Sequence, residues 1–366
     1  MSIPFVDLKT QYNFIKQDID LAISEVINKT TFISGKHVKK FENNFSKLLK
    51  IKNTISCANG TEAIFIALKA LNIGIGDEVI TSSMSWFSTS EAISLTGAKV
   101  VFIDVDINNF NIDISKIEEK ITNKTKAIIP VHLYGNPVNM LKINKIAKKY
   151  KLKIIEDCAQ SHFAKFKKNF AGTFGDCGTF SFYPGKNLGA YGDAGAIVTN
   201  NNKLAKKIRM FVNHGSIKKH EHKFEGINSR MDAIQAAILN VKLKKINIWN
   251  KKRIQIAKLY TKLFLKNESI ITPSIEKNHI NVFHLYVIRS MNRNKLIKKL
   301  KENNIEYGIH YPKALPFLDA YKNLKYTKED YPNAFKLQKE ILSLPIYPEL
   351  KKEQIFKIVK ILNDIN

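Results

Sequence analysis

Short apolar runs alternate with amphipathic stretches through the first two thirds of the chain. The runs predict seven β-strands, which are Thr54–Ala58, Glu78–Thr81, Lys99–Ile103, Ala127–Val131, Lys153–Glu156, Thr179–Phe182 and Ala196–Thr199. Between several of them, apolar residues recur three and four positions apart, as in Thr61–Leu71 and Met140–Tyr150, and this spacing predicts helices. The alternation indicates an α/β fold with a mostly parallel sheet, in which ligands bind at the carboxyl ends of the strands.

The pattern changes after about residue 240. A long Lys-rich helix is predicted over Asp232–Phe264, followed by a strand at Val282–Arg289 and helices at Lys295–Asn303 and Asn333–Ile341. We therefore expect a large ligand-binding domain over residues 1–245, including the N-terminal segment, and a smaller α+β domain over residues 246–366.

Composition narrows the class of protein. The chain has 366 residues and is 44% hydrophobic, enough to bury a sizeable core. No apolar run is long enough to span a bilayer, and the opening MSIPFVDLKT lacks the basic and apolar regions of a signal peptide. The three cysteines, Cys57, Cys158 and Cys177, form no CxxC pair. We expect a reduced, cytoplasmic protein without a disulfide framework, a membrane anchor or a metal site.

The formal net charge of +27 raises the question of nucleic-acid binding. Arginine, whose forked side chain is common in phosphate and base recognition, occurs only at positions 209, 230, 253, 289 and 293. The lysines are spread along the whole chain rather than gathered in one patch. We therefore favour a solvated basic surface over a nucleic-acid partner.

Two candidate ligand contacts follow predicted strands. Asn59-Gly60-Thr61 opens a helix, where free N–H groups, a glycine and a hydroxyl suit a phosphate. An ordinary N-cap with a turn glycine would have the same sequence. Trp86 stands among small hydroxyl residues in TSSMSWFSTS, where it could stack on a planar ring or belong to the core.

A third candidate ends the strand in KLKIIEDCAQSH. Asp157 could pair with a protonated ring nitrogen of a cofactor, or the acids could be plain surface groups. Gln160 and His162 follow within reach of the same pocket. His162 has no carboxylate or cysteine cluster at metal spacing, so a metal-ligand role is not favoured.

The fourth candidate is Lys186 in GTFSFYPGKNLGAYGDAGA. Unlike the lysines in solvated clusters, it is flanked by glycine, proline and apolar residues, and the Ser181 hydroxyl precedes it by five positions. A lysine in such surroundings loses solvation, which lowers its pKa and makes its amine nucleophilic. Together the four candidates supply a phosphate cradle, a stacking aromatic, an acid and a reactive amine, which are the needs of pyridoxal phosphate.

The sequence resembles the DegT/DnrJ/EryC1/StrS family of nucleotide-sugar aminotransferases, which have the fold-type-I architecture of pyridoxal-phosphate enzymes. The resemblance runs nearly end to end through the segments IPFVDLKTQY, FISGKHVKKFE, NGTEAI, IEDCAQSH, GTFSFYPGKNLGAYGDAGA, GINSRMDAIQAAIL, HYPKALP and LPIYPEL. It implies a large domain with a mostly parallel seven-stranded sheet, a smaller C-terminal domain, and pyridoxal phosphate as cofactor.

The resemblance also implies roles for single residues. Lys186 matches the lysine that carries the cofactor and shuttles the proton, Asp157 the acid on the pyridine nitrogen, and Gln160 the residue near the ring hydroxyl. The remaining cofactor matches are Trp86 for stacking, Gly60, Thr61 and Ser181 for the phosphate, and Asn228 for a phosphate contact from the neighbouring subunit. Asn228 implies a homodimer with shared active sites, although taken alone it reads as a turn residue.

The substrate is less sharply indicated. Lysine at position 186, where some family members have histidine and act as dehydratases, favours transamination. The segments FYPGKNLGAYGDAGA and VHLYGNP are similar to those of enzymes that aminate C3 of a dTDP-linked 3-keto-6-deoxyhexose with L-glutamate, in the synthesis of surface glycans. The expected substrate contacts are His162, Tyr183, Arg230, His310 and Tyr311.

One departure and two alternatives accompany this prediction. Phe163 stands where the family commonly has glycine, which leaves the shape of the substrate pocket open. The enzyme could instead aminate C4 of a GDP- or UDP-linked sugar. A non-catalytic regulator with the same fold is the alternative from another class, but it would not need Lys186, Asp157 and Gln160 together.

Overall fold

A computed structural model describes residues 2–218, 220–274 and 278–364 of the chain. Its central feature is a seven-stranded sheet in the order β1-β9-β8-β5-β4-β2-β3. The strands are β1 (Asn53–Cys57), β2 (Glu78–Ser82), β3 (Lys99–Ile103), β4 (Thr125–Ile129), β5 (Lys153–Asp157), β8 (Cys177–Ser181) and β9 (Gly195–Thr199). β9 runs opposite to the other six strands of this sheet, so the prediction of a mostly parallel seven-stranded α/β sheet is confirmed.

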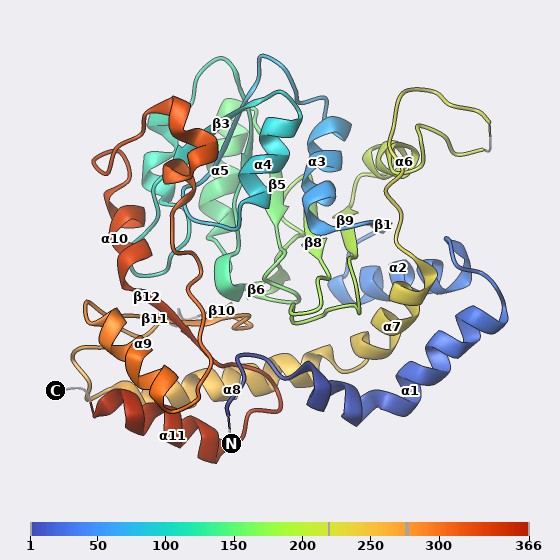
Figure 1. Cartoon of the computed structure of the whole chain (residues 1–366). Helices are drawn as coiled ribbons and strands as arrows, with labels where there is room; N and C mark the ends of the chain where they lie inside the picture. The colour runs from blue at the N-terminus through green and yellow to red at the C-terminus, as the bar shows by residue number, and fades with distance from the viewer. Residues whose placement is uncertain (1, 219, 275–277, 365–366) are drawn as a thin grey trace.

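Helices pack against the sheet, and further helices lie beyond both of its ends (Figure 1). The α-helices are α1 (Leu8–Asn28), α2 (Gly35–Leu49), α3 (Gly60–Ala70), α4 (Ser88–Leu95), α5 (Met140–Tyr150), α6 (Asn202–Phe211), α7 (Ala233–Leu243), α8 (Ile246–Phe264), α9 (Arg293–Glu302), α10 (Pro332–Glu340) and α11 (Lys352–Asn363). None of the helices in the described ranges has the length and apolar character needed to cross a membrane.

Local sequence explains where several helices begin. The side chains of Asn59, Asn139 and Asn201 each accept a hydrogen bond from a backbone N–H of the first turn, and these caps begin α3, α5 and α6. In α2, Phe41 and Phe45 lie four residues apart and are fully buried, so one face of the helix joins the core.

The long helix expected over Asp232–Phe264 is two helices, and that prediction was wrong. The α-helical hydrogen bonding of α7 ends in a tighter turn, in which Lys245 N donates to Lys242 O at 2.9 Å. α7 packs against α1 and α2, whereas α8 runs on toward the C-terminal elements (Figure 1). The break lets each helix follow the surface that it covers.

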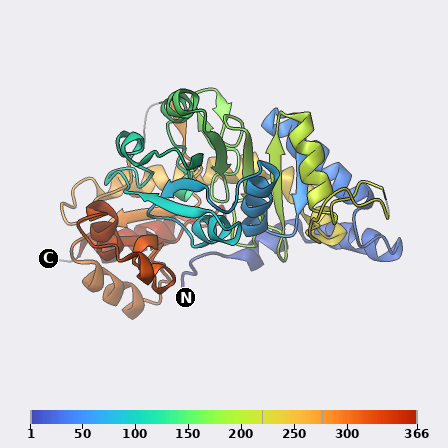
Figure 2. The same ribbon diagram turned by 90° about the horizontal axis from the view of Figure 1, so that it is seen from above.

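The C-terminal elements have a hydrophobic cluster of their own. β11 (Tyr286–Arg289) pairs with β12 (Ile341–Leu344), and buried side chains of α8, α9 and α11 pack around this pair. The strand is shorter than the predicted Val282–Arg289. The cluster also includes Ile3 from the start of the chain. Figure 2 shows these elements at one end of the molecule and α1 and α6 at the other. The domain boundary at 245/246 stays a prediction.

Short elements complete the described ranges. β6 (Lys165–Phe166) pairs with β7 (Asn169–Phe170) and β10 (His279–Ile280) in a small antiparallel sheet. The 3₁₀ helices are η1 (Ile114–Lys116), η2 (Glu118–Lys120), η3 (Leu133–Gly135), η4 (Leu315–Phe317) and η5 (Asp319–Leu324). Of these, η3 matters for function, because it follows β4 at the carboxyl edge of the large sheet.

Candidate active site

A cavity of about 530 Å³ lies between the carboxyl ends of β5 and β8 and the C-terminal elements. Ten of the predicted site residues line this cavity. They are Gly60, Thr61, Trp86, Asp157, Gln160, Ser181, Tyr183, Lys186, His310 and Tyr311. Residues that are far apart in the sequence therefore share one space, as a parallel sheet with its ligand site at one edge requires.

The first turn of α3 approaches the end of β8 closely. A Cβ atom on Gly60 would lie 2.6 Å from the Cβ of Ser181, so a larger residue would push the two elements apart. The hydroxyls of Thr61 and Ser88, at the N-termini of α3 and α4, lie 2.6 Å apart and both line the cavity. Free helix N–H groups together with these hydroxyls form a cradle that suits a phosphate group.

Asp157 ends β5 with its side chain buried. One carboxylate oxygen accepts a hydrogen bond from Thr89 Oγ1 at 2.8 Å, and the other accepts from Ala159 N at 3.1 Å. These bonds fix the orientation of the carboxylate toward the cavity that it lines. An acid held in this way can pair with a protonated pyridine nitrogen.

Trp86 is 59% exposed, so the alternative that it belongs to the core is wrong. Its ring centroid lies 5.7 Å from that of Tyr311, and both rings line the cavity. The indole therefore offers an aromatic face to a planar ligand in this space.

Lys186 sits in the loop between β8 and β9. Burial lowers the pKa of its amine to about 8, and the negative charge of Asp157 opposes part of that shift. Neighbours hold the loop in place, because Asn187 Nδ2 donates to Val282 O at 3.0 Å and Lys242 Nζ donates to Gly189 O at 2.6 Å. The amine is therefore positioned, and it loses its proton far more readily than an ordinary lysine, which makes it a better nucleophile.

His310 and Tyr311 reach the cavity from the C-terminal elements. Gln160 Nε2 donates to Tyr311 Oη at 2.8 Å, and the His310 ring makes a 2.8 Å hydrogen bond with Ser343 and stacks on Phe5. Burial, with a smaller contribution from the charge of Lys186, lowers the pKa of His310 to about 4. At neutral pH this imidazole is uncharged and can exchange hydrogen bonds with a polar ligand.

The structure corrects two predictions beside Gln160. His162 does not line the cavity; its ring packs near Phe180 and Phe182 in the core, where burial lowers its pKa to about 3. Phe163 is also a core residue, packed against Phe45, so it does not shape the pocket. Its φ of +63° explains why glycine suits this position.

Asn228 and Arg230 do not line the cavity of their own chain. Asn228 is exposed and forms an isolated bridge with Asn213, and Arg230 Nη1 donates to Asn213 Oδ1 at 3.4 Å. A direct role at an active site would therefore require the cavity of another chain.

Sequence reasoning missed several residues that line the cavity. Ser88 and Thr89 lie in the hydroxyl-rich segment around Trp86, so a signal for them was present. Arg253 and His284 had none, because they come from α8 and from the segment before β11. Arg253 Nη1 donates to Ile346 O at 2.8 Å, and Nδ1 of the half-buried His284 lies 3.3 Å from Asn187 Oδ1.

Residues 13–363 match the DegT/DnrJ/EryC1/StrS aminotransferase family. The chain is 42% identical over 361 residues to dTDP-3-amino-3,6-dideoxy-alpha-D-galactopyranose transaminase of Aneurinibacillus thermoaerophilus, covering 99% of both chains. It is 44% identical over 356 residues to a pleiotropic regulatory protein of Geobacillus stearothermophilus, covering 97% of this chain and 96% of the relative.

A solved structure agrees in fold with the whole chain. The crystal structure of S. venezuelae DesV in complex with a ketimine intermediate has a TM-score of 0.97 and 34% sequence identity, over 99% of this chain and 98% of that one. The cradle, the oriented acid and the positioned amine fit the phosphate, the ring nitrogen and the aldehyde of pyridoxal phosphate. The chain belongs to the DegT/DnrJ/EryC1/StrS aminotransferase family and is a pyridoxal-phosphate-dependent aminotransferase of nucleotide-linked ketosugars.

Proposed function

We propose that the enzyme transfers the amino group of L-glutamate to C3 of a dTDP-linked 3-keto-6-deoxyhexose. The product is a dTDP-3-amino-3,6-dideoxyhexose for a surface glycan. The observation that supports the transfer chemistry is that the Lys186 amine, with its pKa lowered to about 8, lines the same cavity as Asp157. Support for C3 and dTDP comes from the A. thermoaerophilus relative, a dTDP-3-amino-3,6-dideoxy-alpha-D-galactopyranose transaminase to which this chain is 42% identical.

We assign cofactor contacts to the residues around the cradle and the ring. Gly60, Thr61 and Ser181 hold the phosphate, Trp86 stacks on the ring, and Gln160 lies by the ring hydroxyl. Asp157 keeps the pyridine nitrogen protonated. Pyridoxal phosphate, when bound, supplies the electron sink that acidifies the Cα–H bond of the amino donor.

Lys186 is the proton carrier in this proposal. With the cofactor bound, its amine would take the proton from Cα of the donor and pass it to the cofactor in the first half-reaction. In the second, it would carry a proton from the cofactor to C3 of the sugar, as the amino group is transferred to that carbon. Proton transfer by a positioned side chain typically contributes about 10²–10⁴-fold to the rate. A pKa near 8 suits both directions at neutral pH, because the amine can accept and release a proton without a large penalty.

Tyr183, His310 and Tyr311 are proposed to face the sugar nucleotide. His310 and Tyr311 line the cavity from the C-terminal elements, while Tyr183 lines it from the loop after β8 and is 59% exposed. The uncharged His310 imidazole and the phenol groups suit sugar hydroxyls, which both donate and accept hydrogen bonds. Arg230 is proposed to act in the partner's cavity, together with Asn228, in a homodimer with shared active sites.

The test begins with the visible spectrum of the purified holoenzyme. L-glutamate is expected to bleach the yellow absorption, and a dTDP-linked 3-keto sugar is expected to restore it. A GDP- or UDP-linked 4-keto sugar serves as the competing substrate. Restoration by the 4-keto sugar alone would replace the C3 assignment, and failure of L-glutamate to bleach the colour would replace the amino donor.

The regulator alternative predicts a different result. A chain that binds pyridoxal phosphate without turnover would keep its yellow colour in the presence of L-glutamate and every ketosugar. Because the G. stearothermophilus relative is named a pleiotropic regulatory protein, the spectrum should be tested for this result as well.

A further inference from the structure

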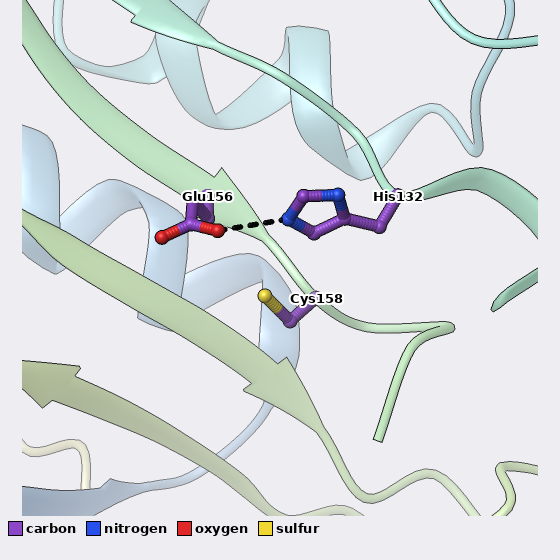
Figure 3. A group of neighbouring side chains, drawn as sticks. All are labelled: His132, Glu156 and Cys158. Atoms are coloured by element: carbon purple, nitrogen blue, oxygen red, sulfur yellow. Dashed lines mark hydrogen bonds and ion pairs between the residues drawn. The ribbon is translucent and has the colours of Figure 1, made fainter. Parts of the chain in front are cut away.

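The carboxylate of Glu156 is fully buried one residue before Asp157. One of its oxygens accepts hydrogen bonds from Phe174 N at 2.7 Å and Gly175 N at 2.9 Å. The other oxygen accepts from Gly172 N at 2.8 Å and meets His132 Nε2 at 3.0 Å (Figure 3). This one side chain therefore ties the end of β5 to the loop before β8 and to His132.

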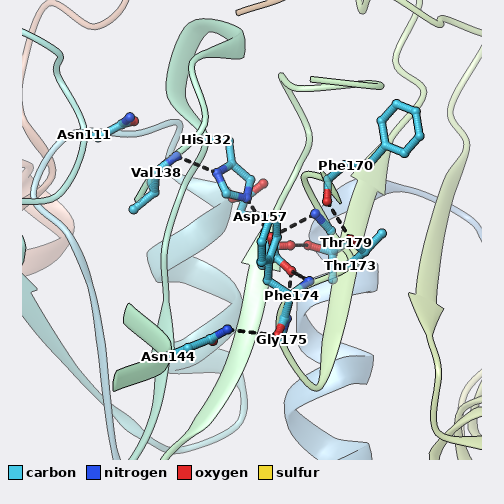
Figure 4. A network of polar contacts seen from close by, with 12 residues as sticks. Asn111, His132, Val138, Asn144, Asp157, Phe170, Thr173, Phe174, Gly175 and Thr179 are labelled. Atoms are coloured by element: carbon cyan, nitrogen blue, oxygen red, sulfur yellow. Dashed lines mark hydrogen bonds and ion pairs between the residues drawn. The ribbon is translucent and has the colours of Figure 1, made fainter. Parts of the chain in front are cut away.

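The neighbours of His132 determine its tautomer. Val138 N donates to Nδ1 at 3.0 Å (Figure 4). Nε2 therefore carries the proton and donates a hydrogen bond to Glu156 (Figure 3). The backbone reinforces this link, because His132 N donates to Asp157 O at 3.1 Å and Asp157 N donates to Pro130 O at 2.9 Å. The segment 130–138 after β4 is thus fixed to the residue that ends β5.

Cys158 lies beside this pair, and one ligand atom from each of His132, Glu156 and Cys158 falls within 4.8 Å of the others. A metal is not needed to explain the cluster. Both ring nitrogens and both carboxylate oxygens already have hydrogen-bond partners, and burial keeps the pKa of the Cys158 thiol well above its usual range.

Tyr134 extends the same segment toward the cavity. Its backbone N donates to Gln160 Oε1 at 2.7 Å, and its hydroxyl donates to the carbonyl of His310. Gln160 in turn donates to Tyr311 Oη at 2.8 Å. Tyr134 therefore connects a residue on the cofactor side with the two residues that enter from the C-terminal elements.

We propose that His132 and Tyr134 are positioning residues: His132, anchored on Glu156, holds the segment behind Asp157, and Tyr134 holds Gln160 and the His310–Tyr311 segment in register. This inference rests on the proposed function, because it concerns the same cavity. The two residues have separate tasks. His132 supports the cofactor side of the cavity through Asp157, and the Tyr134 hydroxyl supports the sugar side through the His310–Tyr311 segment.

The first test is Tyr134→Phe, which removes the hydroxyl and keeps the ring and the backbone bond to Gln160. Amide exchange in the holoenzyme peptide spanning residues 308–312 is expected to become about fivefold to tenfold faster, the effect of losing one hydrogen bond. The dissociation constant of pyridoxal phosphate is expected to stay within about twofold of the parent value.

Tyr260→Phe is the matched control. It also removes one buried hydroxyl, which donates to Pro345 O at 3.1 Å, but it lies in the C-terminal cluster. It should leave exchange in residues 308–312 unchanged. Parent-like exchange in Tyr134→Phe, or an equal acceleration in the control, would overturn the role of Tyr134. This readout needs no ketosugar, so it stands even if the C3 assignment fails.

The second test is His132→Leu, with His132→Gln as the conservative variant that can still donate to Glu156. His132→Leu is expected to weaken pyridoxal phosphate binding about tenfold and to shift the pH midpoint of the visible spectrum, because Asp157 loses its support. His132→Gln should recover part of both. If His132→Leu does not fold, the comparison of His132→Gln with the parent carries the test.

Arg289→Met controls for a general loss of stability. It breaks a buried ion pair away from the cavity, in which Arg289 Nη2 lies 3.0 Å from Glu340. The control should lower the thermal midpoint without changing cofactor affinity or the spectral midpoint. A parent-like spectrum and affinity in His132→Leu, or the same changes in Arg289→Met, would show that His132 is only structural.

Discussion

The chemistry of Lys186 depends on its surroundings rather than on its residue type. Lys186 is half-buried like several other lysines, but its amine lines the cavity, where it is desolvated and feels the charge of Asp157. Burial disfavours the charged form and brings the pKa from its ordinary 10.5 to about 8. The same carboxylate that is proposed to hold the ring nitrogen thus also limits the fall of the lysine pKa.

The pH dependence of cofactor loading follows from this balance. The rate at which the apoprotein turns yellow with pyridoxal phosphate should rise with pH around a midpoint near 8, where Lys186 loses its proton. Asp157→Asn should move the midpoint lower, because the opposing charge is gone. A midpoint that stays in place in this variant would contradict the coupling between the two groups.

The free energy of unfolding of the apoprotein should also depend on pH through the lowered pKa of Lys186. The pKa of Lys186 is lower in the folded chain than in the unfolded one, so the unfolded state binds more protons between pH 8 and 10.5. This group therefore makes the folded state more stable as pH rises through that window. Lys186→Met should remove that contribution, which urea titrations of both proteins across the window would measure.

Removal of the amine should abolish transfer without unfolding the chain. Lys186→Ala is expected to lose at least about 10²–10⁴-fold in the first half-reaction, the usual contribution of a proton-transfer group. Circular dichroism should match the parent. Turnover close to the parent rate would remove Lys186 from its assigned role.

At the scale of elements, the phosphate cradle depends on how closely α3 approaches β8. The glycine at position 60 permits that contact, and the Asn59 cap holds the first turn through a 2.9 Å bond from Glu62 N. The hydroxyls of Thr61 and Ser88 then meet at 2.6 Å, across two helices. The geometry of the cradle is thus a property of packed elements rather than of a single loop.

Gly60→Ala tests this contact. The added Cβ would lie 2.6 Å from the Ser181 Cβ, so α3 must shift away from β8 and the cradle must widen. We expect affinity for pyridoxal phosphate to fall about tenfold or more, as measured by fluorescence titration, with a modest loss of thermal stability. Gly76→Ala is the control: its added Cβ would meet nothing within 4 Å, and its positive φ brings a backbone strain that position 60 lacks, so it should lower thermal stability without lowering cofactor affinity.

At the scale of the molecule, the cavity lies between two hydrophobic clusters. Ile64 and Val131 come from the large sheet and its helices, while Ile346 comes from the C-terminal cluster, and all three line the space. Asn228 and Arg230 do not line this cavity in their own chain. A closed dimer in which each chain completes the other's site would account for them.

Subunit mixing tests this arrangement. Lys186→Ala and Asn228→Asp chains are each expected to bind or use the cofactor poorly, since one lacks the amine and the other brings a negative charge to the phosphate. Refolded together, random dimers should regain intact sites amounting to about a quarter of the total, because a mixed dimer has one complete site. No recovery of activity on mixing would place Asn228 within its own chain or outside the site.

Much of this protein could be predicted from local sequence. The sequence predicts the seven strands of the sheet and the helices α3 and α5. Each of these elements is specified by the spacing of its apolar residues and by its caps and turns, which involve only residues close together in the chain. The residues at strand ends were found for the same reason, since a parallel sheet brings those ends to one edge. Resemblance to a known family then added residues such as Asn228, which had no local signal.

Only the tertiary structure decided which residues share a space. Gln160 meets Tyr311 across 151 positions of sequence, and Arg253 and His284 reach the cavity from segments with no motif. His162 is only two residues from Gln160 but turns into the core, and the helix expected over Asp232–Phe264 breaks into α7 and α8. Local pattern cannot specify these outcomes, because they depend on long-range packing between elements whose separate forms the sequence already determines.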